Sequence, residues 1–168
     1  FLSNGLNLHY SPEEILISGG GRPLIYAAYR TICDRGEKVI YPVPSWNNNH
    51  YTHFIEGEHI CVETKAENNF LPTAEELIPH FKDATLLALC SPLNPTGTVF
   101  TKEQLQAICQ AVIDENKRRG PAQKPLYILY DHIYWTLCYD SEHVNPVSLF
   151  PELKDYTIFI DGISKAFS

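Results

Sequence analysis

Residues Thr85–Cys90 form an unbroken apolar segment, TLLALC, which stops abruptly in a polar loop. A strand with one face in water alternates apolar and polar residues, whereas a strand covered on both faces does not. The segment therefore predicts a central strand of a sheet with helices on both sides. The loop carries Asn94-Pro95-Thr96-Gly97. These are turn residues, so an ordinary strand-to-helix turn is one interpretation. Ligand binding is the other, because open α/β sheets bind ligands beyond their strand ends.

The rest of the chain alternates between strand-like and helix-like segments. A short apolar run at Ile15–Ser18, which ends in three glycines, is predicted to be a strand. Further strands are predicted at Lys38–Tyr41, His59–Val62, Leu126–Tyr130 and Tyr156–Ile160. Helices are predicted over about Pro23–Asp34, Ser45–Ile55 with Ser45 as its cap, Thr73–Phe81 and Thr101–Arg119. The last two begin with capping boxes. This alternation predicts an α/β fold, a three-layer α/β/α domain with a mostly parallel sheet.

The composition of the 168 residues is that of one globular domain, with 44% hydrophobic and 20% charged residues. The net charge of −7 argues against a nucleic-acid partner, which needs clustered basic residues. The apolar runs are too short to span a membrane. The five cysteines are interpreted as small core residues in a reducing, cytoplasmic compartment. The chain has no Met and begins at Phe1, so we expect a piece of a longer protein.

Chemically unusual residues follow several of the predicted strands. Gly20-Gly21-Arg22 precedes a helix, where backbone N–H groups favour an anion, although glycine turns before helices are common. Asp131 closes an apolar strand, which is costly for a carboxylate unless it meets a positive group or caps a turn. Lys165 follows the last predicted strand, in a position where a lysine is usually just solvated.

Taken together, the motifs SGGGRPLIYAAYR, YPVPSWNNNHY, SPLNPTGTVF, YDHIY and GISKAFS resemble the class I/II aminotransferases, which are fold type I pyridoxal-phosphate enzymes. Their order and spacing span residues 18–168. The resemblance implies that the chain is the cofactor-binding large domain of such an enzyme, incomplete over 1–168, with its small domain beyond the end. It also implies amino acid and 2-oxo acid substrates, possibly aspartate or an aromatic amino acid, and a homodimer.

The resemblance assigns a role to each matching residue. Lys165 would form the Schiff base with pyridoxal 5'-phosphate and act as the base, Asp131 would keep the pyridine nitrogen protonated, and Tyr134 would join Asn94 in donating to the ring oxygen. Trp46 would stack on the ring, and the phosphate would bind Gly20, Gly21, Arg22 and Ser164. The chain has Gly162 where many relatives have a hydroxyl residue. The arginines that the family uses for the phosphate and the substrate carboxylate are expected beyond Ser168.

Other interpretations stay open. The same scaffold supports lyases, decarboxylases and synthases, and a fragment could be non-catalytic. A nucleotide-binding α/β domain is a further class, but the chain has no nucleotide fingerprint and Lys165 would be unexplained. His50 and His53 have a spacing that suits a metal, yet no further ligands are grouped nearby, so we predict no metal site. Surface or hydrogen-bonded histidines are expected instead, with His132 bordering the cofactor site.

Overall fold

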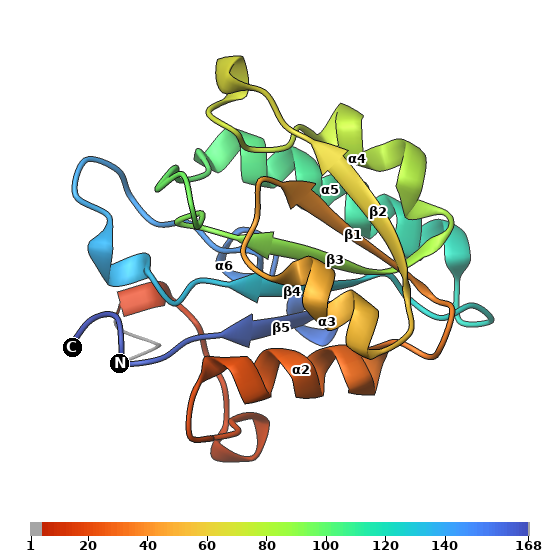
Figure 1. The fold of residues 1–168 in the computed structure, drawn as a ribbon, viewed down its shortest axis with the longest axis horizontal. Coiled ribbons are helices and arrows are strands. Elements are labelled where there is room, and N and C mark those ends of the chain that lie inside the picture. The colour runs from red at the N-terminus through yellow and green to blue at the C-terminus, as the bar shows by residue number, and fades with distance from the viewer. Residues whose placement is uncertain (1–4, 168) are drawn as a thin grey trace.

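The computed structural model describes residues 5–167 and shows a parallel sheet between two layers of helices (Figure 1). The strands are β1 (Lys38–Val43), β2 (Glu58–Glu63), β3 (Ala84–Cys90), β4 (Tyr127–Asp131) and β5 (Thr157–Ile160). The α-helices are α2 (Gly21–Ile32), α3 (Asn48–Phe54), α4 (Ala74–Phe81), α5 (Lys102–Arg119) and α6 (Pro146–Leu149). Short 3-10 helices are η1 (Pro12–Glu14), η2 (Ala66–Asn68), η3 (Trp135–Leu137) and η4 (Pro151–Tyr156).

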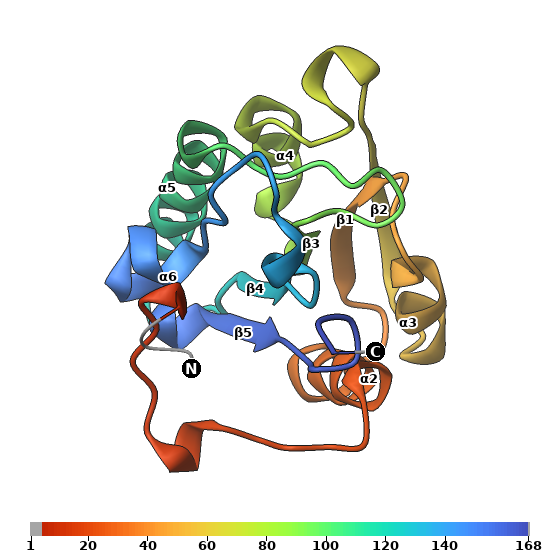
Figure 2. The ribbon, with the colours of Figure 1, turned by 90° about the vertical axis from the view of Figure 1, so that its left-hand side faces the viewer.

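The strands are ordered β2-β1-β3-β4-β5, and each neighbouring pair is parallel. Helices α2 and α3 cover one face, whereas α4, α5 and α6 cover the other (Figure 2). All seven residues of β3 are buried because apolar side chains meet both faces of this central strand. The predicted three-layer α/β/α fold is confirmed.

The two strongest helix predictions are also confirmed at their starting points. In α5 the Thr101 hydroxyl accepts a hydrogen bond from the Gln104 amide at 3.2 Å, and the Gln104 side chain accepts one from the Thr101 amide at 3.0 Å. Thr73 and Glu76 form the same capping box at α4. The apolar stripe of α5 is buried against the sheet at Leu105, Ile108, Cys109, Val112 and Ile113. Caps and periodicity therefore position these helices locally.

Two local predictions are wrong. Helix α3 begins at Asn48, after Asn47 in a left-handed conformation (φ 54°), so Ser45 is not its cap. The Ser45 hydroxyl instead accepts a hydrogen bond from the Asn48 side chain at 3.1 Å. The run Ile15–Ser18 forms no strand, and Ile17 is 90% exposed. A strand needs a hydrogen-bonded neighbour, and the described residues provide none for this run.

The five cysteines are all free, and three of them have the expected buried positions at Cys33, Cys90 and Cys109. Cys138 is only partly buried, and Cys61 is exposed on the edge strand β2, which the sequence did not predict. Among residues 5–167, no helix has both the length and the apolar character that crossing a membrane requires.

Two histidines, His132 and His143, pack against each other beside the end of β4, and their ring nitrogens make no hydrogen bonds to the described residues. His132 is fully buried, and its ring stacks on Phe159 and lies 5.5 Å from the ring of His143, centroid to centroid. No ring nitrogen of either histidine has a hydrogen-bond partner among the described residues. The expectation of surface or hydrogen-bonded histidines is therefore wrong here. Burial lowers the pKa of His132 to about 3, with a contribution from His143, and that of His143 to about 4.

These depressed pKa values predict acid sensitivity. Because the unfolded chain binds protons on both histidines below about pH 6.5 and the folded chain does not, stability falls as the pH drops from about 6.5 toward 4. His132→Phe keeps a ring against Phe159 but removes the titration, so it should flatten this fall in urea unfolding series between pH 7 and pH 4. Replacement of exposed His9 by Gln is the control. Identical pH dependence of wild type and His132→Phe would contradict the assignment.

Candidate active site

The predicted site residues gather at one edge of the sheet. Parallel strands place all their carboxyl ends on the same side, which Figure 2 views nearly end-on. Trp46 follows β1, Asn94 follows β3, Asp131 and Tyr134 lie at and after the end of β4, Ser164 and Lys165 follow β5, and Gly20, Gly21 and Arg22 lie at the start of α2. The order of elements thus brings residues that lie more than a hundred positions apart in sequence to the same edge of the sheet.

Tyr134 lies close to two other candidate residues. The Asn94 side-chain amide donates a hydrogen bond to the Tyr134 hydroxyl at 3.2 Å. The Lys165 amine lies 5.7 Å from the centre of the Tyr134 ring. Asn94, Tyr134 and Lys165 come from three successive strand ends, so β3, β4 and β5 jointly place an amide, a phenol and an amine around one point.

The start of α2 offers an anion-binding site beside this group. Gly20 precedes the helix with φ 143°, a conformation that residues with side chains rarely adopt, and no side chain among residues 5–167 caps the helix. The first backbone N–H groups of α2 therefore have no side-chain acceptor, and they carry the positive end of the helix dipole. A Cβ on Gly21 would lie 3.6 Å from Ile133 and 3.7 Å from Ile160. Gly21 thus packs the first turn of α2 against the ends of β4 and β5.

Arg22 and Trp46 form a second pair at this edge. The guanidinium carbon of Arg22 lies 5.8 Å from the centre of the Trp46 ring, and Trp46 is 45% exposed. A core role for Trp46 is therefore excluded. The buried Tyr51 of α3 lies close enough to Arg22 and Asp131 to feel their charges. Burial raises the pKa of Tyr51, Arg22 opposes this rise, and Asp131 adds to it.

Asp131 is a carboxylate without a cationic partner in the described chain. Its Oδ1 atom accepts a hydrogen bond from the Ile133 amide at 3.1 Å. Burial raises its pKa to about 6, nearby Asp161 adds to the rise, and the Ile133 amide opposes it. Burial also raises the pKa of Asp161, against hydrogen bonds from the Gly162 amide and the Trp135 side chain. Two carboxylates at adjacent strand ends favour a positively charged group between them.

The loop after β5 is open. Ser164 and Lys165 are both exposed. A Cβ on Gly162 would come within 3.3 Å of Ile133, so a larger residue there would press on the β4 end. The structure places Ser164 next to Lys165 but shows no contact between Ser164 and the other candidate residues.

These residues suit pyridoxal 5'-phosphate. Its phosphate matches the open N–H groups of α2, its ring nitrogen matches the unpaired carboxylate of Asp131, and its ring oxygen matches the donors Asn94 and Tyr134. The assignment of each residue to the cofactor remains a prediction. Sequence reasoning gave no role to Tyr51 or Asp161, although Asp161 ends an apolar strand as Asp131 does.

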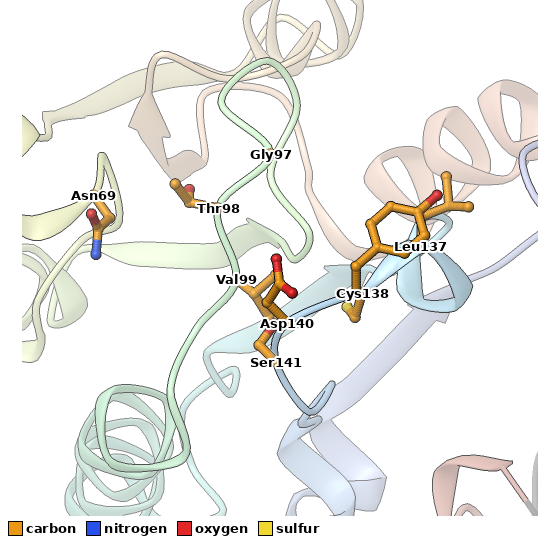
Figure 3. Close-up of a pocket in the computed structure, with 9 residues that line it drawn as sticks. Asn69, Gly97, Thr98, Val99, Leu137, Cys138, Asp140 and Ser141 are labelled. Atoms are coloured by element: carbon orange, nitrogen blue, oxygen red, sulfur yellow. The ribbon is translucent and has the colours of Figure 1, made fainter.

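A separate cavity of about 310 Å³ lies between residues 97–99 and the segment 137–141 (Figure 3). It is lined by Asn69, Gly97, Thr98, Val99, Leu137, Cys138, Tyr139, Asp140 and Ser141. None of the candidate site residues lines it, so the cavity is distinct from the site at the strand ends.

The family described as Aminotransferase class I and II matches residues 1–168. The chain is 32% identical to the aspartate aminotransferase of Bacillus sp. (strain YM-2), over 96% of its own length and 40% of the relative's. It is 32% identical to the aspartate/prephenate aminotransferase of Thermus thermophilus, with 98% of the chain and 40% of the relative covered.

Similar solved structures include the aromatic aminotransferase of Pyrococcus horikoshii, with a TM-score of 0.87, 26% identity, and coverage of 99% of this chain and 43% of that one. The chain thus spans about 40% of the length of the curated relatives that it matches. The match over the whole chain excludes a separate nucleotide-binding family. The chain belongs to the class I and II aminotransferase family, whose cofactor is pyridoxal 5'-phosphate.

Proposed function

We propose that the full-length protein is an aminotransferase that moves an amino group between an amino acid and a 2-oxo acid. The observation that carries the proposal is the convergence of Asn94, Tyr134 and Lys165 beside an unpaired carboxylate, Asp131, and an open helix N-terminus. Family membership supports the same activity. Residues 1–168 form the cofactor-binding large domain in this proposal, and a small domain completes the protein.

The bound cofactor supplies an electron sink for the electron pair left when the Cα–H bond of the substrate breaks. Lys165 would hold the cofactor through its amine, and the same amine would serve as the base that moves the proton at that carbon. Asp131 would keep the ring nitrogen protonated, which would strengthen the sink. Asn94 and Tyr134 would donate hydrogen bonds to the ring oxygen, and Trp46 would stack on the ring. Gly20, Gly21, Arg22 and Ser164 would bind the phosphate.

Aspartate is the proposed donor, because two of the relatives are named aspartate or aspartate/prephenate aminotransferases. An aromatic amino acid is the second candidate, supported by the similarity to an aromatic aminotransferase. We further propose a homodimer in the cytoplasm. The absence of a membrane-spanning helix among residues 5–167 is compatible with that location.

The proposal predicts amino transfer that depends on both substrates. Full-length protein with the cofactor, L-aspartate and 2-oxoglutarate should form glutamate and oxaloacetate in equal amounts, and Lys165→Ala should lower the rate by at least about 100-fold. Lys154→Ala is the control, because Lys154 pairs with Glu14 away from the site. Consumption of the amino acid without a 2-oxo acid would identify a lyase or decarboxylase instead. No turnover with aspartate or an aromatic amino acid would indicate a non-catalytic protein or another substrate.

Asp131→Asn separates catalysis from folding. Asn can still accept the Ile133 hydrogen bond, but it cannot hold a proton on the ring nitrogen, so turnover should fall by at least about 100-fold. Because the folded pKa is raised from 3.8 to about 6, this carboxyl group lowers stability progressively as the pH rises between those two values, and the full loss is present above them. At pH 7 the cofactor-free variant should therefore be as stable as wild type, or about 1 kcal/mol more stable.

Asp83→Asn, on the exposed surface, is the control for this variant. Full activity of Asp131→Asn would mean that Asp131 only caps the turn after β4, a role that Asn fills equally well.

A further inference from the structure

A hydrogen-bonded group of three side chains lies on β1 and β2. In the strand order, β2 is the outermost strand on the side opposite β5. It consists of Cys61 and His59 on the edge strand β2 and Tyr41 on β1, and we call it the β2 relay. In the parallel register Tyr41 pairs with Cys61. His59 and Cys61 are two residues apart on one strand, so they share a face. Both are exposed, whereas Tyr41 is buried.

The hydroxyl of Tyr41 connects the other two residues. It lies 2.8 Å from Nδ1 of His59, and the Cys61 thiol donates a hydrogen bond to it at 3.3 Å. A phenol has a single proton. Because its oxygen accepts from the thiol, its own proton is available for His59, which accepts at Nδ1 when its ring proton is on Nε2. The three groups therefore form a chain with one direction, from sulfur to imidazole.

This chain can move a proton without charging the buried residue. If the thiol proton passes to the Tyr41 oxygen while the Tyr41 proton passes to His59, the products are a thiolate, a neutral phenol and an imidazolium. Both charges then lie on exposed side chains. Burial, together with Cys61, raises the pKa of the Tyr41 hydroxyl, so Tyr41 transmits the proton and does not itself become a phenolate.

The thiols of the other four cysteines are neither exposed nor hydrogen-bonded to a Tyr–His pair. Burial raises the pKa of the Cys33 and Cys109 thiols to about 12 and also raises those of Cys90 and Cys138. None of these four is exposed. Since the thiolate is the reactive form, a reagent in solution should discriminate strongly among the five cysteines.

We propose that Cys61 is a thiol-modification site, activated through Tyr41 and His59, that reacts with low-molecular-weight disulfides. The Cys61 thiolate attacks one sulfur of the disulfide, the S–S bond breaks, and a mixed disulfide forms on Cys61. The leaving thiolate takes the proton from the His59 imidazolium. The disulfide is the oxidant, so the step needs no other electron acceptor. This site is independent of the proposed amino transfer.

The test uses the full-length protein and the neutral disulfide 4,4'-dithiodipyridine, with release of thiopyridone followed between pH 6 and pH 10 and the modified peptide identified by mass spectrometry. Among the five cysteines of residues 1–168, only Cys61 should react fast, and Cys61→Ser should abolish modification of its peptide. A thiol with an ordinary pKa near 8.5 is only about 3% thiolate at pH 7. Tyr41→Phe and His59→Gln should therefore each slow the reaction about tenfold at pH 7 and have no effect at pH 10.

The pH dependence separates activation from access. A tenfold effect that is the same at every pH would mean that the variants change access to Cys61, and it would overturn the proposal. Equal rates of wild type and both variants at pH 7, or a reaction as fast as that of Cys61 at Cys33, Cys90, Cys109 or Cys138, would also overturn it. Tyr127→Phe on β4 controls for the loss of a tyrosine hydroxyl elsewhere in the sheet. If Tyr41→Phe does not fold, the exposed His59→Gln variant decides.

Discussion

Parallel hydrogen bonding between β3 and its neighbours β1 and β4 is the constraint on which the rest of the structure depends. Parallel strands need a crossover between them, and the crossovers here place helices on both faces of the sheet. They also bring every strand's carboxyl end to one edge. The amide of Asn94, the phenol of Tyr134 and the amine of Lys165 lie near one another there because each follows a strand of this sheet, and the carboxylate of Asp131 ends β4 at the same edge. The same constraint partly buries Asp131 and raises its pKa, which makes the edge suited to a cation.

Much of this fold could be predicted from local patterns. The apolar run at Thr85–Cys90 indicated a strand covered on both faces, and β3 is buried throughout. The cap at Thr101 fixed the start of α5. Patterns failed where a neighbour decides the structure. Ser45 is a good capping residue, but its hydroxyl binds the Asn48 side chain, and the helix begins at Asn48. Ile15–Ser18 is apolar enough for a strand, yet among the described residues no strand pairs with it.

The candidate site was predictable as a set of residues and less so as an arrangement. The motifs placed Gly20, Asn94, Asp131 and Lys165 on successive loops, and strand order then determines which of them meet. Sequence alone gives no distances, so the contact between Asn94 and Tyr134 required the structure. Tyr51 and Asp161 were missed because their influence on the site is electrostatic and acts between different elements. His132 was expected to be exposed or hydrogen-bonded, and this was wrong because the burial of a ring without hydrogen bonds leaves no pattern in the sequence. The relay through Tyr41 depends on strand register, which no motif records.

The central claim is that Lys165 holds the cofactor at the edge formed by these strand ends. Reduction of the cofactor-loaded full-length protein with borohydride, followed by protease digestion and mass spectrometry, tests it most directly. The account predicts a pyridoxyl group on the peptide that contains Lys165, with no label on Lys154 or Lys124, which pair with carboxylates elsewhere. A label on any lysine other than Lys165, or a loaded protein that acquires no label, would contradict the account.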